Sequence, residues 1–139
     1  KMTLTKKGAK LIDNDSAIFQ DLFITFTTKF NWAYFDGFSD EENGQLGFGF
    51  TLILLSKYGK EYRRPEFYAE KYLNAFNFET KNPMLEFADN PTRAYIIRTF
   101  ERFLKHFNFI EYYNDQKHIY VRRTKTFNEL IKIRKYKNR

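Results

Sequence analysis

The sequence contains no cysteine and only two histidines among its 139 residues. The absence of cysteine excludes disulfides, thiolate nucleophiles and zinc fingers, and two histidines far apart in the sequence offer little to a metal site. The longest apolar stretch, residues 48–55, is much shorter than the roughly 20 residues that cross a bilayer. The first residues also lack the pattern of a signal peptide. We therefore expect a cytoplasmic protein with no metal, no cofactor and no membrane contact.

Recognisable catalytic motifs are also missing from the sequence. It has no H-E-x-x-H pair, no P-loop and no G-x-S-x-G turn. His106 falls in a predicted helix and His118 begins a predicted strand, where a lone histidine is more often structural than catalytic. Carboxylates from distant positions can still meet in a folded chain. The composition therefore disfavours catalysis without excluding it, and we expect a protein that is not an enzyme.

The aromatic content and the charge distribution are the most informative features that are present. Aromatic residues make up 20% of the chain, with 17 Phe and 10 Tyr, which a disordered chain would lack. The net charge is +7, and residues 120–139 carry eight Lys or Arg against one Glu, so the first 119 residues are neutral overall. Charge concentrated in this way attracts an anionic partner. The alternative interpretation is a solvated basic helix.

The first 45 residues read as an N-terminal helical segment that packs on the core. Thr5 can cap a helix over residues 6–12, and apolar residues recur at helical spacing from Ser16 to Phe30. Residues 31–38 contain four aromatic side chains, which more often anchor a core than stack on a ligand. The abrupt start of the sequence suggests a part of a longer protein.

The remaining residues, 46–139, predict a second domain of helices and one hairpin. Apolar periodicity predicts helices over residues 46–58, 65–76 and 92–107, with a linking segment over residues 77–90. Residues 109–113 and 118–123 are rich in aromatic and β-branched residues and predict a β-hairpin. Thr126 and Glu129 have the spacing of a capping box before a basic helix over residues 126–136. The expected class is mainly α, of the α+β type, with a C-terminal β-hairpin.

The order of these elements resembles that of the winged-helix superfamily over roughly residues 46–136. The stretch from Phe103 to Glu111, FLKHFNFIE, followed by a hairpin resembles the junction between the recognition helix and the wing. The linker before the third helix is longer than in a tight helix-turn-helix. LTKKG at residues 4–8 and FNWAY at residues 30–34 also resemble segments of uncharacterised bacterial proteins, a resemblance that implies no function.

The winged-helix resemblance implies binding of duplex nucleic acid, with the third helix in the major groove and the wing on the backbone. The alternative is a protein–protein interaction or oligomerisation module, because this fold alone does not define a function. Grouping of the basic residues with the wing would favour nucleic acid, and scattering would favour a solvated surface. The expected contacts are Arg93, Arg98, Arg102 and Lys105 on the helix, Lys117, His118, Arg122 and Arg123 on the wing, and Lys125, Lys132, Arg134 and Lys135 at the basic end.

Overall fold

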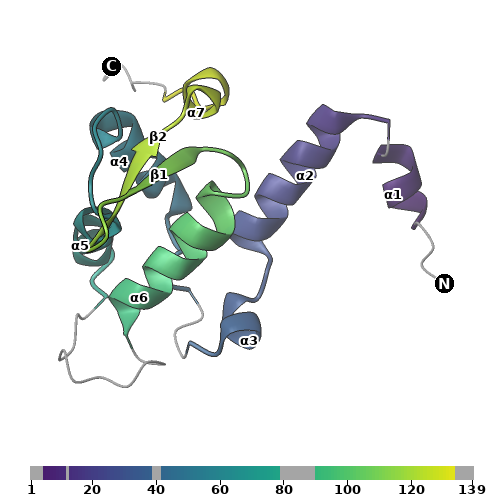
Figure 1. Ribbon diagram of the computed structural model, residues 1–139. Coiled ribbons are helices and arrows are strands. Elements are labelled where there is room, and N and C mark those ends of the chain that lie inside the picture. The colour runs from purple at the N-terminus through teal and green to yellow at the C-terminus, as the bar shows by residue number, and fades with distance from the viewer. Residues whose placement is uncertain (1–4, 12, 39–41, 79–89, 134–139) are drawn as a thin grey trace, which may run out of the picture. The chain divides into compact units, whose positions relative to one another are not determined.

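The computed structural model describes residues 5–11, 13–38, 42–78 and 90–133 (Figure 1). The chain divides into two compact units, Lys1–Phe30 and Asn31–Arg139. The division therefore falls at residue 30, whereas the sequence suggested residue 45. The segment between these two positions belongs with the second unit.

The first unit contains two helices, α1 (Lys6–Leu11) and α2 (Asp15–Thr28). The predicted cap is present, because the Thr5 hydroxyl accepts a hydrogen bond from the Gly8 N–H at 3.1 Å. Asn14 caps α2 in the same way through the Ala17 N–H at 3.0 Å. Along α2, Phe19 and Phe23 stack at helical spacing. The predicted periodicity thus corresponds to a real helix.

The second unit is mainly helical and carries one β-hairpin, which confirms the expected α+β class (Figure 1). Pro65 and Pro91 each begin a helix, as a proline at the first helical position favours. Among the described residues, no helix is both long and apolar enough to cross a bilayer. The elements are α3 (Trp32–Asp36), α4 (Phe48–Tyr58), α5 (Pro65–Ala75), α6 (Pro91–Tyr95), its continuation η2 (Ile96–Leu104), β1 (Ile110–Asn114), β2 (Ile119–Arg123) and α7 (Lys125–Leu130).

The hairpin has a defined register and a third, short partner. Tyr112 lies opposite Val121, and Tyr113 lies opposite Tyr120. On the other edge of β2, Arg63 and Val121 exchange two backbone hydrogen bonds of 3.1 and 2.8 Å. The segment between α4 and α5 therefore runs antiparallel to β2 as a third strand-like piece.

The core of the second unit is built largely from aromatic side chains of α5, α6 and η2. Tyr72 and Tyr95 are fully buried and stack with ring centroids 4.3 Å apart. The Tyr95 hydroxyl shares a buried hydrogen bond of 2.9 Å with Thr51 of α4. The Tyr72 hydroxyl donates to the Leu46 carbonyl oxygen at 2.6 Å. These bonds satisfy the polar ends of the rings, which can then be buried at little cost.

Two elements differ from the sequence-based prediction. The helix predicted over residues 92–107 corresponds to α6 and η2, and it becomes a π-helix from Ile96 onward. Its side chains therefore do not follow the α-helical period. The last helix begins at Lys125, one residue earlier than predicted, because the hydroxyl of Thr124, and not that of Thr126, caps it through the Phe127 N–H at 3.2 Å. That helix ends at Leu130, and only part of the predicted range to residue 136 is described. The predicted linker lies mostly outside the described residues.

Candidate nucleic-acid interface

Arg98 occupies a buried position, and its predicted place on an exposed basic face is wrong. Its guanidinium meets the carboxylate of Asp36 through two hydrogen bonds, from Nε at 2.8 Å and from Nη2 at 2.9 Å. Nη1 donates a third bond to the Asn43 carbonyl oxygen at 3.0 Å. Both side chains are only 1% exposed. Arg98 therefore joins α3, the following loop and η2 from inside, and it is not available to a phosphate.

The pKa of Asp36 reflects this environment. Burial of the carboxyl alone would raise its pKa, but the hydrogen bonds from Arg98 and the Phe38 N–H, with the charges of Arg98 and Arg102, outweigh burial and lower it. Arg102 lies 3.6 Å from the same carboxylate and covers the Phe35 ring at 4.8 Å. Asp36 therefore stays ionised at neutral pH and offsets the charges of Arg98 and Arg102, two of the expected nucleic-acid contacts.

Arg93 and Lys105, the other two contacts expected on the helix that α6 and η2 form, lie at the protein surface. Arg93 and Lys105 are exposed, and the Lys105 ammonium lies 5.5 Å from the centre of the Tyr112 ring. Glu101, also exposed, lies on the same helix. The helix therefore carries separated cations with an acid among them.

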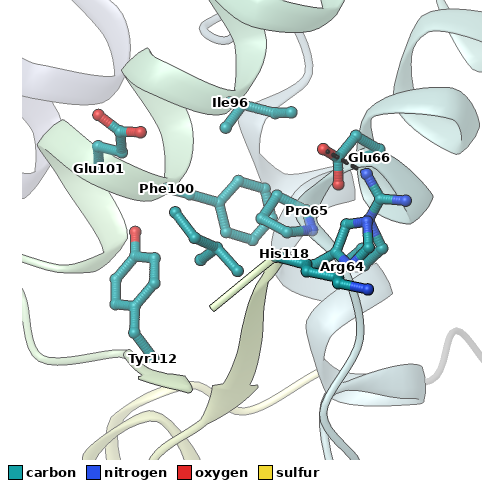
Figure 2. Close-up of a pocket in the computed structure, with 10 residues that line it drawn as sticks. Arg64, Pro65, Glu66, Ile96, Phe100, Glu101, Tyr112 and His118 are labelled. Atoms are coloured by element: carbon teal, nitrogen blue, oxygen red, sulfur yellow. Dashed lines mark hydrogen bonds and ion pairs between the residues drawn. The ribbon is translucent and has the colours of Figure 1, made fainter. Parts of the chain in front are cut away.

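The turn of the hairpin places Lys117 and His118 at a cleft of about 230 Å³ beside the start of α5 and η2 (Figure 2). Phe100 and other apolar side chains form much of its wall. Burial, together with the charge of Glu101, raises the pKa of Tyr112, whose hydroxyl has no hydrogen-bond partner within the described residues. The carboxylates of Glu66 and Glu101 balance the charges of Arg64 and Lys117 here, so the cleft has no excess of positive charge. Its lining is completed by Arg64, Pro65, Ile96 and Ile119.

Four cations converge on a second hollow, at the opposite end of the hairpin. We call this hollow of about 400 Å³ the basic groove; it is lined by Lys60, Glu111, Arg122, Arg123, Thr124, Lys125 and Asn128. Glu111 is the only carboxylate among these lining residues. The groove thus contains three of the expected contacts, Arg122, Arg123 and Lys125. The fourth cation, Lys60, comes from the segment between α4 and α5.

The four cations of the basic groove differ in their hydrogen-bond and ion-pair partners. Arg122 pairs with Glu111, with Nε 2.6 Å from the carboxylate. Arg123 donates to the Ser56 carbonyl oxygen at 2.5 Å and so caps the end of α4. Lys125 contacts Glu129 at 3.5 Å but is 90% exposed. Lys60 is exposed and has no ion-pair partner within the described ranges. The groove therefore combines two fixed guanidinium groups with two exposed ammonium groups.

The last predicted contacts lie at the end of the chain. Lys132 donates to the Asn128 carbonyl oxygen at 2.6 Å, next to the basic groove. Arg134 and Lys135 lie outside the described residues. Within the described ranges, no three His, Asp or Glu side chains come together as metal ligands would.

Lys60 has only a weak signal in the sequence, where it stands in a basic run over residues 60–64. Nothing local showed that this run pairs with β2, because the connection is a single bridge between Arg63 and Val121. No protein-family model, curated protein or solved structure matches the chain.

Proposed function

We propose that residues 46–139 form a non-enzymatic, winged-helix-like module that binds nucleic acid through the basic groove. The order helix, strand-like segment, two helices, hairpin and helix supports the winged-helix part of the proposal. The pairing of the 60–64 segment with β2 adds a third strand beside the hairpin, where the winged-helix arrangement would have one.

The observation that carries the function is the convergence of Lys60, Arg122, Arg123 and Lys125 around one carboxylate. Guanidinium groups make bidentate contacts with phosphate, and ammonium groups act as mobile point charges. Arg122 and Arg123 are adjacent on β2 and are held by Glu111 and by the end of α4. Two fixed guanidinium groups and two exposed ammonium groups around one hollow suit a chain of phosphates better than one small anion.

The contact proposed here is with the sugar–phosphate backbone, which positions a protein without reading sequence. The third helix contributes little, because Arg98 is buried and Arg102 shares the carboxylate of Asp36. The proposed contact therefore rests on the wing, the start of α7 and Lys60, and it leaves out the helix that α6 and η2 form.

Charge reversal tests the proposal directly. We would measure fluorescence anisotropy of labelled random-sequence oligonucleotides, single-stranded and duplex, with the K60E/K125E variant. Both lysines are exposed, so the variant should fold. Loss of two phosphate contacts corresponds to a loss of affinity of about 10- to 60-fold at 0.1 M salt.

The matched control is R93E/K105E. It changes the net charge by the same amount, but its two residues belong to α6 and to the end of η2, outside the groove lining. We expect its affinity to stay within about threefold of the wild type, because screening weakens distant charges. An equal loss in both variants would contradict the assignment to the groove. No binding by the wild type at low salt would contradict nucleic-acid binding and favour a protein partner or a second copy of the chain.

A further inference from the structure

The three-stranded arrangement places a set of tyrosines on the sheet face opposite the core. Arg63 and Val121 form a bridge pair, and Val121 is fully buried, so both belong to the inner face. Side chains alternate along a strand, which puts Tyr62 on the outer face together with Tyr120. Tyr113 lies opposite Tyr120 in the hairpin register and shares that face. We call Tyr62, Tyr113 and Tyr120 the tyrosine row.

The rings of the tyrosine row are in contact, and two of them are exposed to solvent while Tyr120 is half-buried. The centroids of Tyr62 and Tyr113 are 5.7 Å apart, and those of Tyr113 and Tyr120 are 6.2 Å apart. Tyr62 is 39% exposed and Tyr113 is 53% exposed. Cross-strand pairing stabilises a hairpin and accounts for the contact between Tyr113 and Tyr120. It does not account for the extension of the row to Tyr62, which lies outside the hairpin.

Arg122 connects the tyrosine row to the basic groove. Its guanidinium lies 4.6 Å from the centre of the Tyr62 ring and also lines the groove. Three carboxylates from the same segments are already engaged, Glu111 with Arg122, Glu61 with Arg63, and Asp115 with the hairpin turn and the Tyr120 side chain. The outer face therefore offers aromatic surface that continues into a hollow of positive charge.

We propose that the tyrosine row stacks the unpaired bases of a single-stranded nucleic acid whose phosphates lie in the basic groove. This inference rests on the proposed function and specifies its ligand. Aromatic side chains beside a basic groove are what a single strand recognises, because every base has a face that can stack. In a duplex those faces are covered by neighbouring base pairs. Charge complementarity with the groove favours a polynucleotide over an apolar protein partner.

The test compares a labelled 12-nucleotide oligothymidine with a 12-base-pair duplex in anisotropy titrations. The wild type should bind the single strand more tightly. The Y62L/Y113L variant keeps apolar side chains on the strands but removes the ring faces. It should lose affinity for the single strand by about 5-fold or more per ring, that is, by about 25-fold or more in total. Its affinity for the duplex should change much less.

Two matched variants separate stacking from general effects. Y34L removes a tyrosine that is 92% exposed on α3, away from the row, and should bind as the wild type does. Y62F/Y113F keeps the rings and should bind the single strand at least about tenfold more tightly than Y62L/Y113L. If the leucine variant fails to fold, ultraviolet crosslinking of the wild type to oligothymidine should label the peptides that contain Tyr62 and Tyr113.

The outcomes distinguish this inference from the function on which it rests. If the duplex binds as tightly as the single strand and Y62L/Y113L changes neither, the stacking inference is wrong and backbone binding by the groove stands. Crosslinks confined to other peptides would also overturn it. If neither oligonucleotide binds, both proposals fail together.

Discussion

Removal of one member of the buried Arg98–Asp36 pair is expected to destabilise the second unit strongly. The R98M variant keeps an unbranched side chain in the interior but removes four hydrogen bonds, two to Asp36 and one each to the carbonyl oxygens of Asn43 and Phe38. It leaves the carboxylate of Asp36 inside the protein, with Arg102 as the remaining cation at 3.6 Å. A charge that stays buried without its partner raises the free energy of the folded state. R98M should therefore lose more stability than the lost hydrogen bonds alone account for.

The expected loss is about 3–5 kcal/mol of unfolding free energy, the range for breaking a buried ion pair by removing one partner. That is a large part of the roughly 5–15 kcal/mol that typically stabilises a domain. The double variant R98M/D36L removes both charges and should be more stable than R98M alone, because no uncompensated charge then remains buried.

Urea denaturation followed by the fluorescence of Trp32 provides the assay. Trp32 is the only tryptophan and lies on α3 with Asp36, so it reports on the part of the fold that the pair fixes. A loss below about 1 kcal/mol in R98M would match a surface ion pair and not a buried one. That result would refute the buried position of Arg98 and restore the exposed basic face predicted from the sequence.

The same pair predicts a pH dependence of stability. The pKa of Asp36 in the folded protein lies below its ordinary value of 3.8, so its stabilising contribution is present above that value. As the pH falls through the lower, folded pKa, the carboxylate is protonated and the contribution is lost. Urea midpoints between pH 5 and pH 2.5 should therefore fall more steeply for the wild type than for D36N, and parallel curves would contradict this assignment.

The remaining predictions concern local structure around the site. Gly47 has a φ of +61°, and a Cβ there would lie 1.9 Å from Phe76, so G47A should destabilise the protein by about 1–3 kcal/mol in thermal unfolding. G49A meets open space within α4 and should be neutral or stabilising by up to about 1 kcal/mol. R123Q removes the cap of α4 and should cost about 1–3 kcal/mol, whereas K60Q should leave the stability unchanged; the reverse order would contradict the assigned roles.

Local signals in the sequence predicted most of the secondary structure. The helix expected over residues 46–58 is α4 from Phe48 to Tyr58, and its end at Gly59 was visible as a glycine stop. The hairpin lies within one residue of its expected bounds, because alternation and turn chemistry are encoded by neighbouring residues.

The candidate site depends on pairings that neighbouring residues do not encode. Arg98 fits a basic stripe on a helical wheel, but its partner Asp36 is 62 residues away in the sequence, and the π-helical turn of η2 changes the direction of its side chain. Lys60 joins the groove through a bridge that involves a single residue pair, Arg63 and Val121. Of the expected contacts on the wing, Arg122 and Arg123 line the basic groove, whereas Lys117 and His118 line the other cleft.

The measurement that tests the central claim most directly is the salt dependence of oligonucleotide affinity for the wild type and for K60E/K125E. Four phosphate contacts in the basic groove correspond to a slope of log affinity against log salt of about −2.8 for a single strand and about −3.6 for a duplex. Loss of the two lysines should roughly halve that slope. An affinity independent of salt, or a slope unchanged in the variant, would contradict a nucleic-acid contact at this groove.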